Sequence, residues 1–192
     1  MPDDITELIL ADHHSFRRGF ITLDDLSVRN DPEELTSAWQ PLADLLEVHA
    51  VAEEEIFYPQ LLREEGPAAE EDTVDAIGDH NEIRDAVREA ARFPVGSKQW
   101  WEAVGQARIA NDEHLAEEER DPIADFRKHA SLELREALGK RFREFKAAHP
   151  GQRGLDTGDK DPERYVEQTE RRVGVGGPPD DGSLGIGGLR GR

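Results

Sequence analysis

Hydrophobic residues recur every three or four positions along most of the chain, up to about residue 147. The first run of this pattern consists of Ile5, Ile9, His13, Phe16, Phe20 and Leu23. Because an α-helix turns once every 3.6 residues, this spacing places the side chains on one helical face. The pattern therefore predicts a helix with one apolar face, and His13 lies on that face.

The same spacing predicts three more long helices and one shorter helix. The second begins at "NDPEEL", where Asp31 is the expected N-cap and Pro32 the first helical residue, and it runs to Pro59. The third and fourth carry their apolar positions over 74–87 and 100–118, and Pro122 loosens or stops the fourth. The fifth is expected at about 131–147.

These helices predict an all-α fold. No segment alternates apolar and polar residues over a strand-like length, so we expect no sheet. Four helices of similar length with short connections are typical of an antiparallel up-down four-helix bundle. We therefore predict one bundle domain over residues 1–149, with the fifth helix against one of its sides.

The chain changes in composition after Pro150. Residues 151–192 hold 11 of the 17 glycines and few large apolar side chains. Such a segment buries too little surface to offset the entropy lost on ordering. We predict a Gly-rich, disordered tail over 150–192, in which "DPERYVEQTERR" (161–172) can form a helix or an interaction motif.

The charge of the chain excludes several classes of function. The formal net charge is −19, with 43 acidic against 24 basic residues, so binding to nucleic acid or to an anionic membrane is not expected. No apolar run is long enough to span a bilayer, and the start of the chain lacks the features of a secretion signal. We expect a cytoplasmic location. Cysteine is absent, so any metal site must use histidine, carboxylate, tyrosine or water.

One pattern of histidine and glutamate occurs twice. In each copy a histidine on an apolar face is followed, 34 to 36 residues later, by a His-x-x-x-Glu sequence in the next helix. Positions i and i+4 lie one turn apart on the same helical face. An antiparallel bundle directs these faces at one axis, so six side chains are expected to meet in the core. They are His13, His49, Glu53, His80, His114 and Glu118.

Six buried ionisable groups need a compensating interaction, because burying them unpaired costs several kcal/mol each. Metal coordination is the explanation that fits the repeated pattern. Imidazole and carboxylate ligands suit iron, manganese, zinc or copper better than calcium or magnesium. Four histidines and two carboxylates are enough for two ions, with the carboxylates bridging them. A metal-free helical interaction domain is the alternative without a site.

Several neighbouring residues are not expected to be ligands. His14 lies off the apolar face, and His129 and His149 lie beyond the repeat. Glu119 is a rival to Glu118 as the ligand of the fourth helix. The remaining acidic neighbours, Glu54, Glu55 and Glu117, are expected to be solvated or to support the ligands.

Two aromatic residues follow the first Glu of the pattern. On a regular helix Tyr58 points away from the His49–Glu53 face, so it is left out of the predicted site. Phe57 is expected to face inward and to form a wall of the metal pocket.

These motifs resemble the hemerythrin-like, or HHE cation-binding, family. The resemblance covers about residues 5–147 and rests on "LADHHSF", "HAVAEEEIFYP", "GDHNEIRDAV" and "HLAEEERDPI". It implies a four-helix bundle around a non-haem site of two iron ions, oxo- or carboxylate-bridged, with Glu53 and Glu118 as the bridging carboxylates. A ferritin-like site is excluded, because no histidine here has Glu three residues before it.

The chain departs from the O2-carrying members at two positions. Where they repeat histidine in the third helix this chain has Arg84, and where they place Asp five residues after the last histidine it has Glu118 at four. The departures favour the relatives that handle peroxide, NO or O2 over a reversible O2 carrier. We expect the site to handle O2 or peroxide, and peroxide disproportionation is one reaction of this kind. The alternative is a module that binds or senses O2, NO or iron without catalysis. The expected partner is this small molecule, and no protein partner for the tail is predicted.

Overall fold

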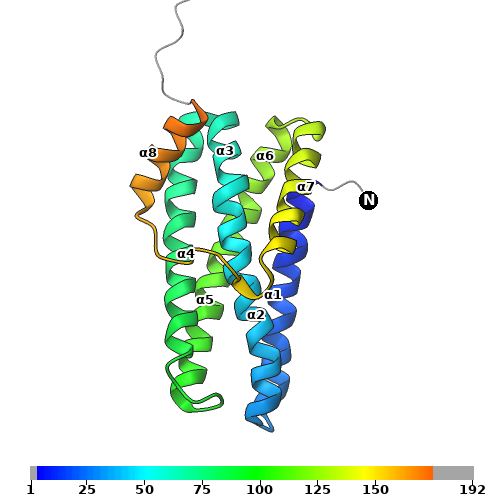
Figure 1. Cartoon of the computed structure of the whole chain (residues 1–192), viewed down its shortest axis with the longest axis vertical. Helices are drawn as coiled ribbons and strands as arrows, with labels where there is room; N and C mark the ends of the chain where they lie inside the picture. The colour runs from blue at the N-terminus through cyan, green and yellow to red at the C-terminus, as the bar shows by residue number, and fades with distance from the viewer. Residues whose placement is uncertain (1–3, 175–192) are drawn as a thin grey trace, which may run out of the picture.

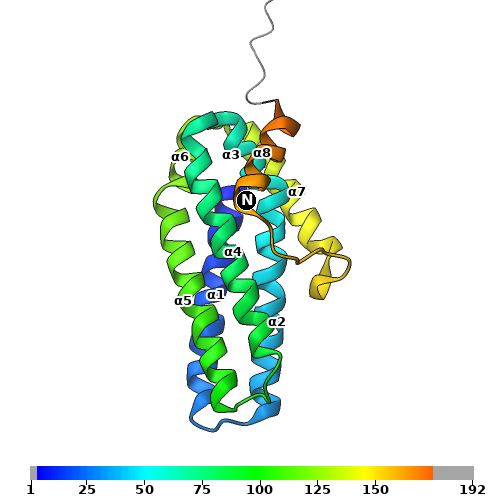
Figure 2. The ribbon, with the colours of Figure 1, turned by 90° about the vertical axis from the view of Figure 1, so that its left-hand side faces the viewer.

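The computed structural model describes residues 4–174, and every regular element in that range is a helix. The four longest are α1 (Ile5–Ser27), α2 (Pro32–Ala52), α4 (Glu70–Ala90) and α5 (Lys98–Arg120). They lie side by side and are joined in sequence so that neighbours run in opposite directions (Figures 1 and 2). The predicted all-α bundle is confirmed.

Side-chain caps fix where the long helices begin. Asp31 accepts hydrogen bonds from the backbone N–H groups of Glu33 at 2.9 Å and Glu34 at 3.1 Å, and Pro32 follows it, as predicted. Asp4 caps α1 and Ser97 caps α5 in the same way. These caps satisfy backbone donors that have no partner within the helix.

The second predicted helix continues beyond its expected end. After α2 the chain makes a π-helical turn, η1 (Glu53–Phe57), and proceeds as α3 (Tyr58–Glu65). Pro59 does not stop the helix because it falls in the first turn of α3, where a missing N–H group costs little. A 3-10 turn, η2 (Gly66–Ala69), then leads into α4.

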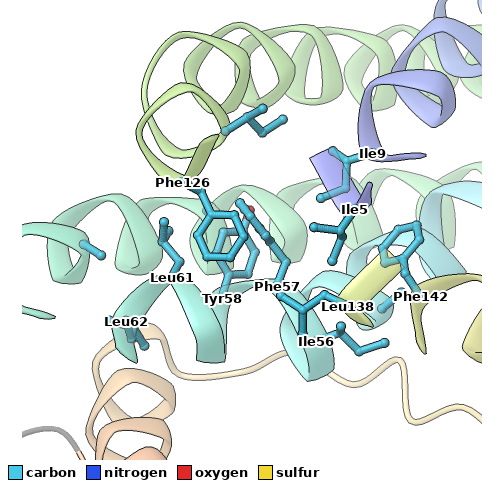
Figure 3. Packing of buried hydrophobic residues seen from close by; sticks show 14 of the residues in the cluster. Ile5, Ile9, Ile56, Phe57, Tyr58, Leu61, Leu62, Phe126, Leu138 and Phe142 are labelled. Atoms are coloured by element: carbon cyan, nitrogen blue, oxygen red, sulfur yellow. The ribbon is translucent and has the colours of Figure 1, made fainter. Parts of the chain in front are cut away.

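The core consists of two apolar clusters separated along the bundle. One gathers around Phe57, Tyr58 and Phe126, with side chains from α1, α3, α6 and α7 (Figure 3). The other lies toward the α1–α2 turn and contains Phe16, Trp39 and Trp100 among others. Along α1, α2 and α4 the residues of the predicted site fall between members of the two clusters. The polar site is therefore enclosed by apolar packing at both ends.

Two shorter helices follow the bundle. α6 (Pro122–His129) begins at the proline that was expected to interrupt the fourth helix, and α7 (Leu132–Ala148) corresponds to the predicted fifth helix. α7 packs against α1 and α2, which is the expected position at one side of the bundle (Figure 1).

The segment predicted as a tail from residue 150 begins with ordered structure, and the helix given as one possibility for 161–172 is present. A short 3-10 turn, η3 (Pro150–Gln152), contacts α2, and the chain then crosses to α8 (Pro162–Val173), which packs on α3 and α4 (Figure 1). Val166 and Thr169 are buried there, so this stretch contributes apolar contacts that its composition did not indicate. The flexible tail predicted for the last residues lies in 175–192, outside the described range.

Within residues 4–174, no helix has both the length and the apolar composition needed to cross a membrane.

Candidate metal centre

The structure brings all six predicted ligands together. One histidine comes from each long helix, and each glutamate lies one turn from the histidine that precedes it. All six side chains are at most 3 % exposed. Whether they bind a metal ion stays a prediction, but their assembly at one level of the bundle is an observation.

The six residues form two groups that share Glu53. In each group one nitrogen or oxygen atom per residue lies within 4.8 Å of the others. The first group is His13, His49, Glu53 and Glu118; the second is Glu53, His80 and His114. The Nε2 atom of His49 is 2.9 Å from Oε1 of Glu53, and that of His80 is 3.4 Å from Oε2 of the same carboxylate. Glu53 is thus the carboxylate placed between two potential ions.

Several buried atoms at the centre of this cluster have no hydrogen-bond partner outside it. They face one another instead: Nε2 of His13 lies 3.2 Å from Oε2 of Glu118, and Nε2 of His49 lies 2.9 Å from Oε1 of Glu53. Converging imidazole nitrogens and carboxylate oxygens that are buried together are the donor set of an N/O metal site, so the residues fit the implied cation.

Each of the four histidines has a carboxylate next to its Nδ1 atom, on the side of the ring away from the centre of the cluster. The Nδ1 atoms lie at hydrogen-bond or ion-pair distance from one acid each: His13–Glu119 at 2.9 Å, His49–Asp12 at 3.1 Å, His80–Glu54 at 2.9 Å and His114–Asp79 at 3.3 Å. Such a partner fixes the ring orientation and holds the proton on Nδ1, which leaves Nε2 free for a metal. All four rings therefore present Nε2 to the centre.

The sequence carries a signal for these supporting acids. Asp12 and Asp79 directly precede the first histidine of each copy, and Glu54 and Glu119 directly follow the glutamate of each copy. Each Asp then supports the second histidine of its own copy, and each Glu supports a histidine of the other copy. Of the two roles expected for Glu54, solvated acid or support for a ligand, the structure shows the supporting one, since the side chain is fully buried beside His80. Glu119 is a supporting acid and Glu118 occupies the ligand position.

Charges around the site shift several pKa values. Burial lowers the pKa of His49, but the carboxylates of Glu53 and Asp12 outweigh this and raise it to about 10. Burial would raise the pKa of Glu54, yet His80 and the nearby cations lower it to about 2. Without a metal ion, these shifts favour a protonated imidazole at His49 and an ionised carboxylate at Glu54. A cation that binds here must displace such protons.

Arg84 occupies the position where O2 carriers repeat histidine, and it does not enter the cluster. It is 1 % exposed and donates to Glu54 through Nη2 at 2.7 Å, while its Nε lies 3.4 Å from Glu47. A buried arginine requires such carboxylate partners. Arg84 therefore supports His80 indirectly, through Glu54, and the second group keeps three candidate ligands.

The expectation for Tyr58 is wrong. Its hydroxyl donates to Oε1 of Glu118 at 2.9 Å, and the side chain is fully buried. A regular helix would turn Tyr58 about 140° away from Glu53. The π-helical turn η1 adds one residue to the turn and so rotates the following chain by about 100°, which brings Tyr58 back toward the centre.

The other neighbouring residues lie away from the centre. His14 is exposed, and His129 is 57 % exposed beside Glu65, as expected for residues that are not ligands. Phe57 faces inward but packs against Tyr58 and Phe126. Phe16 and Phe142 both contact His49, with ring centroids 4.9 Å and 6.0 Å from that of the imidazole, and Tyr58 contacts His80.

Comparison with known proteins agrees with this geometry. The chain matches the family model described as "Hemerythrin HHE cation binding domain" over residues 4–124. That range includes all six residues of the two groups and ends before α7 and α8. None of the curated proteins and none of the solved structures compared with the chain gives a significant match. The chain belongs to the hemerythrin HHE cation-binding domain family.

Proposed function

We propose that this protein binds two iron ions in the His/Glu cluster and handles O2 or hydrogen peroxide there. The observation that supports this best is the pair of buried groups sharing Glu53, whose central nitrogen and oxygen atoms face one another. One shared carboxylate between two sets of imidazoles suits a pair of ions better than a single one. Imidazole and carboxylate donors without thiolate are compatible with iron.

When bound, a pair of iron ions would supply the redox chemistry that O2 or peroxide requires. The residues of the chain have three tasks around it. The supporting acids orient the imidazoles, the apolar clusters at both ends exclude water, and Tyr58 orients Glu118. Burial, together with Glu118 and Glu53, raises the pKa of Tyr58, so its hydroxyl keeps the proton that it donates to Glu118.

Non-catalytic sensing of O2, NO or iron is the second candidate, and one observation favours it. The segment after the family match contacts the site, because Lys160 forms an ion pair with the Glu54 carboxylate and the Tyr165 hydroxyl donates to the Glu54 backbone oxygen. Glu54 supports His80. A change at His80 would therefore be transmitted to α8 through a single residue.

Metal analysis of protein purified from iron-supplemented cells tests the proposal. We expect two iron ions per chain, one for each group, and a fall in thermal stability when a chelator removes them, because a ligand that binds the native state stabilises it. Hydrogen peroxide is then added and oxygen release is recorded. Sustained release supports peroxide disproportionation, iron without turnover supports sensing or binding, and protein that takes up no iron contradicts both.

A further inference from the structure

Three of the four supporting acids are neutralised by a basic residue, and the fourth is not. Asp12 pairs with Lys146, Glu119 with Arg17, and Glu54 with both Arg84 and Lys160. Within residues 4–174, no lysine or arginine forms an ion pair with Asp79, whose side chain is 29 % exposed. Asp79 is therefore the supporting acid without a basic partner among the described residues; Glu119 is similarly exposed, at 31 %, but is paired with Arg17.

A pocket of about 140 Å³ opens on this fourth side, between α4, α5 and the start of α6. These three elements lie together on the face seen in Figure 2. From α4 it is lined by Asp72, Asp75 and Asp79, which are three and four residues apart and so share one helical face.

The inner wall of the pocket is formed by two predicted ligands. His114 and Glu118 line it from α5, and both are 2 % exposed. Oε2 of Glu118 lies 3.2 Å from Nε2 of His13, in the first group. The pocket thus ends at two of the six predicted ligand residues. A larger pocket of about 700 Å³ lies under α8, but none of the six predicted ligands lines it.

The outer wall is strongly negative. Glu117 and Asp121 add carboxylates from α5 and the turn that follows it, and Arg120 is the basic residue among the lining side chains. Arg120 points to solvent, 67 % exposed, and is paired with Asp121. Burial, and then the charges of Asp121 and Asp75, raise the pKa of Asp72, which reflects the concentration of negative charge. Carboxylates of one sign around a narrow opening attract cations and speed their arrival.

We propose that this acidic pocket is the entrance through which a divalent cation reaches the His/Glu centre. The inference rests on the proposed function only in requiring that the centre binds metal. It assigns Asp72 and Asp75 a role in the rate of loading and none in holding the ion, since neither belongs to the two ligand groups. Replacing Asp72 and Asp75 should therefore change the rate of metal uptake and leave the equilibrium affinity of the centre for the metal unchanged.

The test is the rate of Co²⁺ uptake by metal-free protein, followed by the visible absorption of the bound ion. Co²⁺ is kept dilute, so that arrival limits the rate. The variant D72N/D75N is compared with D25N/E33Q, which makes the same change in charge near the α1–α2 turn, far from the pocket. We expect D72N/D75N to load roughly 3- to 10-fold more slowly at low salt, with the final Co²⁺ content unchanged, and D25N/E33Q to load within about twofold of the unmodified rate.

Salt provides a second measurement that needs no substitution. Uptake by the unmodified protein should slow as ionic strength rises, and the slowing should be weaker in D72N/D75N. Equal uptake rates and equal salt dependence in the two double variants would contradict the proposal that the acidic pocket is the entrance, but would leave the proposed metal centre unaffected. Unmodified protein that binds no Co²⁺ and no Fe²⁺ would overturn the metal centre and the entrance together.

Discussion

The two halves of the centre come from a repeated sequence pattern, yet they are not equivalent. The first group offers four candidate ligands and the second three, because Glu53 belongs to both groups and Glu118 to one. The carboxylate of Glu118 accepts a hydrogen bond from the Tyr58 hydroxyl, whereas the carboxylate of Glu53 lies between the imidazoles of His49 and His80. The repeated pattern thus predicts which residues meet. The two groups differ in the carboxylate of Glu118, which belongs to the first group alone and is oriented by Tyr58.

The asymmetry originates five residues after each glutamate. That position is Tyr58 after Glu53 and Ile123 after Glu118. The π-helical turn carries Tyr58 toward the centre, while α5 ends at Arg120 and Ile123 packs in the apolar cluster. Glu118, from the second copy of the pattern, therefore receives a hydrogen bond from Tyr58 of the first copy, whereas Ile123 gives Glu53 no such donor. The second group has three candidate ligands against four in the first, and the acidic pocket opens beside its His114.

The largest difference is expected between the two glutamates. Glu53→Ala removes a ligand from both groups and should leave the purified protein with almost no bound iron, whereas Glu118→Ala should retain one of the two ions, in the second group. Elemental analysis of both variants, with helical content checked by circular dichroism, measures this. Equal iron content in the two variants would show that the glutamates are equivalent and that the asymmetry described above is not functional.

Single histidine substitutions should separate the groups. His49→Ala is expected to lose the ion of the first group and His114→Ala that of the second, because each removes an imidazole that no other residue replaces. A Co²⁺ titration of each variant should show one remaining site. His129→Ala is the control, since His129 is exposed and distant from the cluster, and its titration should match that of the unmodified protein.

The supporting acids should have smaller effects that differ between the halves. Asp12→Asn and Asp79→Asn each weaken a histidine–carboxylate pair, which typically lowers metal affinity about 10- to 100-fold. Asp12 is more buried than Asp79, so its replacement should fall toward the upper end of that range and the replacement of Asp79 toward the lower. Competition with a chelator of known affinity gives both values. A larger loss in Asp79→Asn would reverse this order.

Tyr58→Phe should have the smallest effect on metal content and a measurable one on stability. The change leaves Oε1 of Glu118 without its donor, which should lower the free energy of unfolding of the metal-free protein by about 1–2 kcal/mol. Both ions should still bind, because Tyr58 is in neither group. Denaturant unfolding and elemental analysis test the two statements separately; loss of an ion would instead make Tyr58 part of the coordination.

The sequence by itself determined the helices and the members of the cluster. Helical spacing is a local property, so the faces that carry His13, His49, His80 and His114 follow from the order of residues alone. The cap at Asp31 and the composition without cysteine are equally local. A bundle then leaves few ways to pack four such faces, which is why the six predicted ligands lie together.

The tertiary structure decided the features that depend on small rotations and on distant contacts. The π-helical turn at Glu53–Phe57 is not apparent from residue spacing, and it alone moves Tyr58 into the site. The pairing of Lys160 with Glu54 joins residues 106 positions apart, and the burial of α8 depends on the surface that α3 and α4 present to it. Such contacts arise only once the bundle has formed, because a local pattern specifies the face of a helix but not the side chain that will lie against it.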